Sequence, residues 1–129
     1  MKHKQLADQV MKMLLSGDDE VLITLREQYE RAAIISEEDT GVGFFICYQV
    51  DHALRVGEEF KTTFHLGDID GEVDGIDGAV GFVLFIKDGY LTMLEGYTNG
   101  IDKWPETDAE IKLHHIPACE RTSLRLPGR

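Results

Sequence analysis

The chain has 129 residues and a formal net charge of −11, a length that leaves room for one domain. Apolar residues make up 43% and aromatic residues 9%, enough for one hydrophobic core, so a wholly disordered chain is excluded. No apolar run approaches the roughly 20 residues that a membrane-spanning helix needs. We therefore expect a single domain over 1–129, helical over 1–32, mainly β over 33–116, with a loose basic tail at 117–129.

The negative charge is unevenly distributed along the chain. Residues 61–110 carry 3 basic and 11 acidic side chains, a charge of −8, whereas residues 111–129 carry 4 basic and 1 acidic, a charge of +3. An acidic surface repels phosphate groups, so nucleic acid and anionic membrane surfaces are disfavoured as partners. One interpretation of the charge is solubility alone. The other is an acidic face that receives a basic protein partner.

The N-terminal segment and the cysteines predict a reduced, cytoplasmic protein. Residues 1–4 begin basic, but polar and acidic residues interrupt the next segment, unlike a secretory signal. Cys47 and Cys119 form no C-x-x-C motif and no disulfide framework, so we expect two free thiols. Cys47 lies in an apolar segment, which favours a buried, inert thiol.

Two amphipathic helices are predicted at the start of the chain. Residues 3–15 carry apolar side chains at the spacing of one helical face, namely Leu6, Val10, Met13 and Leu14. Gly17 is expected to end this helix, and Asp18 or Asp19 is expected to cap a second one. The apolar stripe of the second helix comprises Leu22, Leu25 and Tyr29.

After residue 32 the hydrophobic pattern changes from helical to alternating. We expect a short strand at 33–36, followed by an acidic loop at 37–39. Further alternating segments at 42–50, 60–66 and 111–116 also predict strands. The sequence therefore predicts an α+β fold, in which two N-terminal helices pack on a mainly antiparallel sheet of about five to six strands.

The strongest local signal is the pair Asp88-Gly89 between two apolar runs. Such a pair forms a two-residue hairpin turn, because both of its positions take positive φ. The turn predicts a register that sets Ile86 opposite Leu91, Leu84 opposite Met93 and Phe82 opposite Glu95. Both faces of this hairpin are largely apolar, so we expect it at the centre of the sheet with a packed layer on each side.

Residues 68–77 interleave acidic side chains with glycines, and a calcium-dependent module is one interpretation of this segment. An EF-hand loop that begins at Asp68 or Asp70 needs Glu at its twelfth position, where this chain has Ala79 or Gly81. The alternative is a solvent-facing extended row that discourages edge pairing and suits a Lys/Arg-rich partner. The carboxylates of this row are Asp68, Asp70, Glu72 and Asp74.

Common catalytic and metal-binding motifs are missing from the chain. There is no P-loop, no nucleophile elbow and no H-E-x-x-H. A dinucleotide-like start at 41–43 fails, because Ile46 stands where the third glycine belongs. His114 and His115 are adjacent, so on a strand they point to opposite faces. We expect no catalytic residue, no cofactor and no metal ion.

Three stretches share an order and spacing with other sequences. They are TGVGFF at 40–45, FHLGD at 64–68, and the run 81–105 that contains GFVLFIKDG, LEGYT and WP. Over residues 31–106 the chain resembles a group of small uncharacterised bacterial proteins with this pattern. The resemblance implies no activity. Within the pattern, Glu95, Tyr97 and Trp104 lie around a Gly-rich loop at a strand end, where binding residues often collect.

Three functions are compatible with these observations. The first is a small acidic, non-enzymatic binding protein, an immunity-type or regulatory partner of a basic protein. Its binding residues would be Asp68, Asp70, Glu72, Asp74, Glu95, Tyr97 and Trp104. The second is a small enzyme that pairs Glu95 or Asp68 with a histidine, and the third is a calcium-dependent module at 68–77. The oligomeric state stays open.

Overall fold

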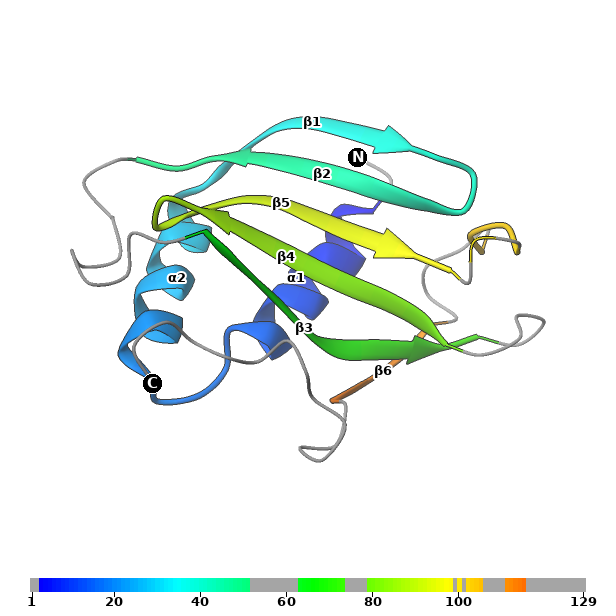
Figure 1. Cartoon of the computed structure of the whole chain (residues 1–129), viewed down its shortest axis with the longest axis horizontal. Coiled ribbons are helices and arrows are strands. Elements are labelled where there is room, and N and C mark those ends of the chain that lie inside the picture. Colours follow the sequence, from blue (N-terminus) through cyan, green and yellow to red (C-terminus); the bar gives the residue numbers. More distant parts are fainter. Residues whose placement is uncertain are drawn as a thin grey trace.

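Two helices lie on one face of a six-stranded antiparallel sheet in the computed structural model (Figure 1). The structure describes residues 3–51, 63–73, 79–98, 100, 102–105 and 111–115. The helices are α1 (Lys4–Leu14) and α2 (Glu20–Arg31). The strands are β1 (Ala33–Asp39), β2 (Gly43–Gln49), β3 (Phe64–Glu72), β4 (Val80–Lys87), β5 (Tyr90–Tyr97) and β6 (Lys112–His115). The predicted α+β fold with N-terminal helices is confirmed.

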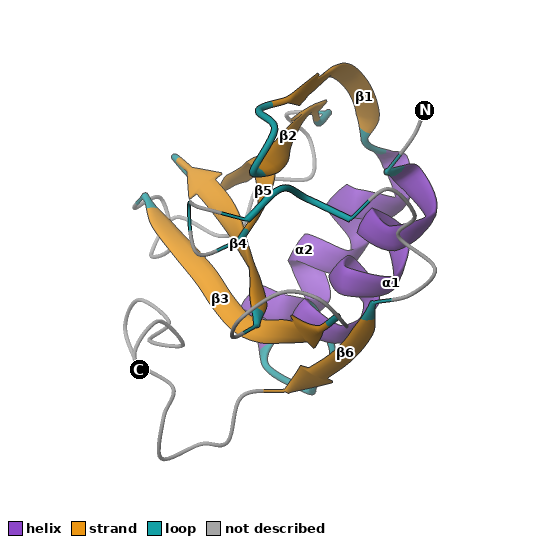
Figure 2. Ribbon diagram, turned by 90° about the vertical axis from the view of Figure 1, so that its right-hand side faces the viewer, coloured by secondary structure: helices purple, strands orange, loops and turns teal. Residues whose placement is uncertain are grey.

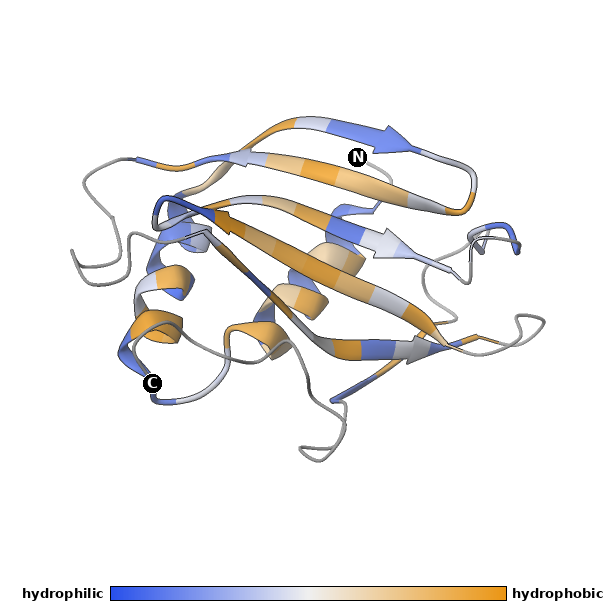
Figure 3. Cartoon of the chain, viewed as in Figure 1, coloured by the Kyte–Doolittle hydropathy of each residue, from blue (hydrophilic) through white to orange (hydrophobic). Residues whose placement is uncertain are grey.

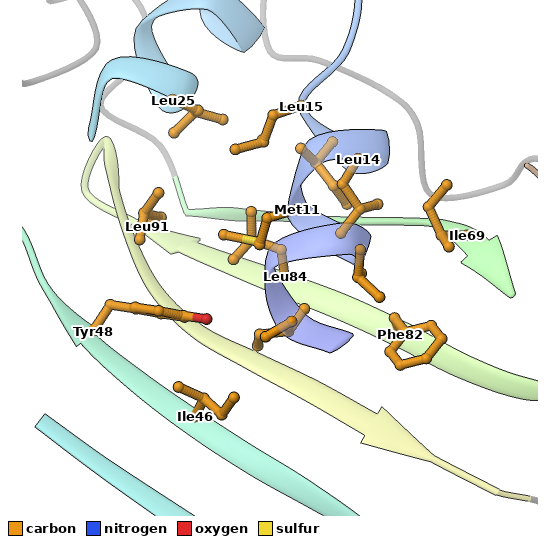
Figure 4. Close-up of a cluster of buried hydrophobic side chains, with 14 of the residues drawn as sticks. Met11, Leu14, Leu15, Leu25, Ile46, Tyr48, Ile69, Phe82, Leu84 and Leu91 are labelled. Carbon is orange, nitrogen blue, oxygen red and sulfur yellow. The ribbon is translucent and has the colours of Figure 1, made fainter. Parts of the chain in front are cut away.

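Both helices form where the sequence predicts them. The Asp19 side chain accepts a hydrogen bond from the Val21 amide at 2.9 Å and so caps α2. Glu20 in the first turn and Arg31 in the last turn of α2 complement the helix dipole. The apolar faces of α1 and α2 pack on the sheet and form one core with it (Figure 4). Residues of this core that are buried on the helices include Leu6, Val10, Met11, Leu14, Val21 and Leu25.

The hairpin of β4 and β5 lies in the middle of the sheet, as predicted. The strand order is β1-β2-β5-β4-β3-β6, and neighbouring strands are antiparallel. β4 is apolar along most of its length (Figure 3). Alternate side chains on the central strands point toward the helices and are fully buried, namely Phe44, Ile46, Leu66, Phe82, Leu84, Ile86, Leu91 and Leu94. The sheet curls around the helices, which Figure 2 shows on one side of it.

The turn between β4 and β5 is the predicted two-residue turn. Asp88 has φ 52° and Gly89 has φ 87°, and Ile86 lies opposite Leu91. A β-branched residue is strained at positive φ. Replacing Gly89 by valine is therefore expected to lower the free energy of unfolding by about 1–3 kcal/mol, measured by urea denaturation. An unchanged midpoint would contradict the assigned turn.

Beyond the turn, the predicted register of the hairpin is wrong by one residue. The ladder shifts between Phe85 and Ile86, so that Leu84 lies opposite Leu94 and Val83 lies opposite Glu95. The extra residue belongs to β5, where the Thr92 hydroxyl donates a hydrogen bond to the Phe85 carbonyl at 3.0 Å. A bulge of one residue moves every later side chain to the other face. Glu95 therefore points away from the helices, whereas the predicted register placed it opposite buried Phe82.

Three other element boundaries differ from the prediction. β1 continues through 37–39, which was expected to be a loop, because these three residues pair with Phe44, Phe45 and Ile46 of β2. Two of these acids also contact the start of α1: the His3 ring nitrogen Nε2 lies 2.7 Å from Asp39 Oδ1, and the His3 amide donates to Glu37 Oε1 at 2.8 Å. β3 begins at Phe64 and continues through 67–72 after an irregularity between Leu66 and Ile69. β5 extends to Tyr97, which was expected in a loop. A loop is also predicted at 51–59, where Asp51, Gly57, Glu58 and Glu59 cluster, and like the predicted tail at 117–129 it falls almost entirely outside the described residues.

Candidate functional site

One face of the sheet carries apolar side chains with nothing described on top of them. We call this the open face: the side of the sheet turned away from α1 and α2 (Figure 2). A packed layer was expected on both sides of the central hairpin, but among the described residues only the helix side has one. The half-buried apolar side chains of the open face are Phe45, Cys47, Val83, Phe85 and Met93. An apolar sheet surface without a described cover is the principal candidate for a binding surface.

Strand pairing arranges the open face in cross-strand rows. The first row runs from Cys47 on β2 through Met93 on β5 to Phe85 on β4. Exposed His65 continues this row on β3, with its ring centroid 6.3 Å from that of Phe85. Apolar side chains that lie opposite each other on neighbouring strands stabilise a sheet. Here they also form a continuous contact surface.

The second row places a carboxylate between two apolar side chains. Glu95 on β5 lies between Phe45 on β2 and Val83 on β4, and exposed Glu38 ends the row on β1. Burial raises the pKa of the Glu95 carboxyl above its usual value. Among the described residues, this carboxylate forms neither a hydrogen bond nor an ion pair. The carboxylate–histidine pair that an enzyme near Glu95 would need is thus not formed within the described part of the chain.

The third row holds an aromatic ring whose tip lies over a glycine of the neighbouring strand. Tyr97 on β5 is flanked by Gly43 and Gly81, and Asp70 on β3 follows Gly81 in the row. A Cβ atom on Gly81 would lie 2.5 Å from both Cζ and Oη of Tyr97, so the ring occupies the space that a side chain would fill. Tyr97 remains 41% exposed. Burial raises the pKa of the Tyr97 phenol, and the negative charges of Glu95 and Asp70 raise it further.

Trp104, which the sequence pattern groups with Tyr97 and Glu95, lies on the opposite side of the sheet. Its ring packs edge-on against Phe44 at 5.1 Å and Phe82 at 6.0 Å between centroids, beside the core. Its backbone amide donates to the Gly41 carbonyl at 2.9 Å. The structure therefore brings Glu95, Tyr97 and Asp70 together and separates Trp104 from them.

The predicted acidic row is only partly described. Ile69 is buried while Glu72 is exposed, as the alternation predicts, and Glu72 Oε2 lies 3.6 Å from the His114 Nε2 atom of β6. Asp74 and the side chain of Asp68 lie outside the described residues. In the part of the chain that is described, no three His, Cys, Asp or Glu side chains form a metal-binding group.

We expect no stoichiometric calcium binding by the full chain. The glycine and alanine at the twelfth positions deprive an EF-hand-like loop of its bidentate carboxylate. Isothermal titration with CaCl₂ should therefore give no saturable signal with a dissociation constant below about 10⁻⁴ M. A saturable signal below that value would restore the calcium-dependent module.

A second polar cluster, which the sequence patterns do not indicate, lies between α1, α2 and β2. The Tyr29 hydroxyl donates to Asp8 Oδ1, and Lys4 Nζ lies 2.9 Å from Asp8 Oδ2. These residues line a pocket of about 300 Å³ together with Tyr48, which packs edge-on against Tyr29 at 5.6 Å. Burial raises the pKa of Tyr48 to about 12. The Tyr48 hydroxyl is buried and has no partner in hydrogen-bond geometry among the described residues, because the neighbouring Tyr29 hydroxyl donates to Asp8 instead.

Tyr48→Phe is therefore expected to leave the free energy of unfolding within about 0.5 kcal/mol of wild type, or to raise it. The substitution removes a buried hydroxyl that has no partner in the described structure and keeps the ring in place. Thermal and urea unfolding would measure the difference. A loss above about 1 kcal/mol would show that the hydroxyl is satisfied in solution.

No family model, curated protein or solved structure matches this chain. None of the described helices is both long and apolar enough to span a membrane.

Proposed function

We propose that this protein is a small acidic, non-enzymatic binding protein that receives a basic, partly apolar segment of another protein on its open face. The proposal rests mainly on the row Cys47–Met93–Phe85. This row is apolar and half-buried, and it lies on the side of the sheet that no described element covers. Apolar surface of this kind is stabilised when a partner removes it from water.

The open face is a better docking surface than the β1 edge of the sheet. β1 is an outer strand, and its ladder with β2 is irregular between Ile34 and Ser36. Bulges on edge strands disturb the row of amide and carbonyl groups that a further strand would pair with. The open face instead presents side chains of four paired strands at once.

The acidic side chains of the open face favour a basic partner. The open face carries Glu38, Glu95 and Asp70, with Glu72 beside them, in a chain of net charge −11. Covering a carboxylate costs free energy unless a cation is placed against it. A partner with Lys or Arg among its apolar side chains meets both requirements, whereas a second copy of this acidic chain would be repelled. We also propose a cytoplasmic location, in which the Cys47 thiol stays reduced.

The test compares two apolar-to-acidic substitutions in the immobilised full-length protein. Phe85→Glu places a charge in the open face, and Ile23→Glu places the same charge on α2, where Ile23 is 39% exposed. Circular dichroism checks that each variant folds, and Met93→Glu replaces Phe85→Glu if that variant does not fold. We expect a basic protein from the host lysate to bind wild type and the Ile23 variant, and to bind the open-face variant at least about tenfold more weakly.

Hydrogen exchange on the purified complex locates the contact. The proposal expects new protection in β2, β4 and β5, on the open-face rows. Equal binding by wild type and the Phe85 variant, or protection confined to α1 and α2, would overturn it.

The experiments also distinguish two other occupants of the open face, a second copy of the protein and the chain's own C-terminal segment. If the protein alone is a dimer that Phe85→Glu converts to a monomer, the face binds a second copy and the proposal is wrong. If reversal of Arg121, Arg125 and Arg129 to Glu deprotects β4 and β5 without any partner, the basic C-terminal segment occupies the face, and the proposal is again wrong.

A further inference from the structure

Tyr97 presents an open aromatic surface between two carboxylates. Its ring lies over Gly81, and Asp70 is the next residue of that row on β3. Glu95 lies two residues before Tyr97 on the same strand and the same face, about 6.8 Å away along β5. Strand register places both carboxylates on the open face beside Tyr97, and their negative charges raise the pKa of the Tyr97 phenol.

The two carboxylates are unpaired with respect to the described chain. Neither Glu95 nor Asp70 forms an ion pair or a side-chain hydrogen bond among the described residues. Glu95 is also partly buried between Phe45 and Val83, so a partner that covers these two side chains covers the carboxylate as well. Covering an ionised carboxylate costs free energy, which a cation placed against it offsets.

The arrangement of Tyr97 between Glu95 and Asp70 favours a guanidinium group over an ammonium group. A guanidinium is planar, stacks on an aromatic face and donates hydrogen bonds in its plane to carboxylates on either side. The Tyr97 ring supplies the face, and Glu95 and Asp70 supply acceptors from two different strands. An ammonium group is a compact, strongly hydrated charge that gains less from a flat ring.

We propose that the bound segment of the partner places an arginine side chain on the Tyr97 ring, between Glu95 and Asp70. This inference rests on the proposed function, since it names the side chain that the open face selects. Apolar residues of the partner then lie on Met93 and Phe85, and the arginine fixes their register along the strands.

The test uses small probes, so that it does not depend on the identity of the partner. N-acetyl-arginine methylamide is titrated into the isotopically labelled full-length protein, and nuclear magnetic resonance follows the side chains of Glu95, Asp70 and Tyr97. The lysine and citrulline analogues serve as probes of charge and of shape. We expect a saturable shift with arginine, an affinity about three- to fivefold weaker with lysine, and no shift with citrulline.

Two variants and one matched control locate the binding. Glu95→Gln removes one carboxylate charge, and Gly81→Ala displaces the Tyr97 ring from its position over residue 81. Each should weaken arginine binding about three- to fivefold. Glu38→Gln removes the same charge from the far end of the second row and should leave the affinity unchanged.

Equal affinity of wild type and Glu95→Gln, or shifts of Glu38 as large as those of Glu95, would overturn the arginine site. This failure differs from failure of the proposed function. If the arginine probe fails while Phe85→Glu still abolishes partner binding, the open face binds its partner without this contact.

Discussion

Replacing Gln28 by leucine is expected to lower the free energy of unfolding by about 2–4 kcal/mol. Gln28 on α2 is 0% exposed. Its Nε2 donates to the Gly89 carbonyl at 2.9 Å, and its Oε1 accepts from the Leu91 amide at 3.0 Å. Leucine fills a similar volume but leaves two buried backbone groups without partners, and each such group costs about 1–3 kcal/mol.

A neighbouring position on the same helix provides the control. Glu27 is exposed, so Glu27→Leu makes the same apolar change without removing a buried hydrogen bond, and should stay within about 0.5 kcal/mol of wild type. Urea unfolding of both variants measures the difference. If Gln28→Leu is as stable as Glu27→Leu, then α2 is not fastened to the β4–β5 turn in the way that these contacts indicate.

Gln28 also marks the limit of what the sequence predicts. The helices, the Asp19 cap and the Asp88-Gly89 turn depend on residues a few positions apart, so their patterns are visible in the chain. The partners of Gln28 lie 61 and 63 residues away. His3 is similar, because a buried histidine paired with Asp39 across 36 residues leaves no local signal.

The open face depends on a feature of the same kind. The bulge in β5, opposite Phe85 and Ile86, cannot be inferred from the alternation of this strand, in which both faces are apolar. Without the bulge, Glu95 would face the core opposite Phe82. With it, Glu95 lies beside Val83 and shares a face with Tyr97. The sequence therefore identified Asp70, Glu95 and Tyr97 as candidate binding residues, but its register placed Glu95 opposite Phe82 instead of Val83.

Trp104 shows why the third aromatic candidate could not be placed. It follows Tyr97 by seven residues in a Gly-containing loop, so proximity in the chain suggested one shared site. The loop returns to the helix side of the sheet, where the Trp104 ring covers Phe44 and Phe82. The path of the loop determines which face of the sheet Trp104 covers. The positions of the glycines in the sequence do not predict that path.

The largest kinetic effect is expected for association with the proposed basic partner. Steering by an acidic surface should make the association rate constant fall at least about tenfold between low and physiological ionic strength. The Debye length at physiological salt is about 8 Å, which screens the charges of the open face from a partner still approaching. Stopped-flow measurements over a salt series test this directly.

Charge reversal shows whether the steering belongs to the open face. Glu72→Lys reverses an exposed carboxylate on β3 beside the open-face rows, whereas Glu27→Lys makes the same change in net charge at an exposed position of α2. The β3 variant should slow association more than the α2 variant and change dissociation less than association, because charges at the rim of a contact act mainly before docking. Equal slowing by the two variants would mean that net charge alone attracts the partner. In that case the carboxylates of the open face serve solubility and give the partner no preferred approach.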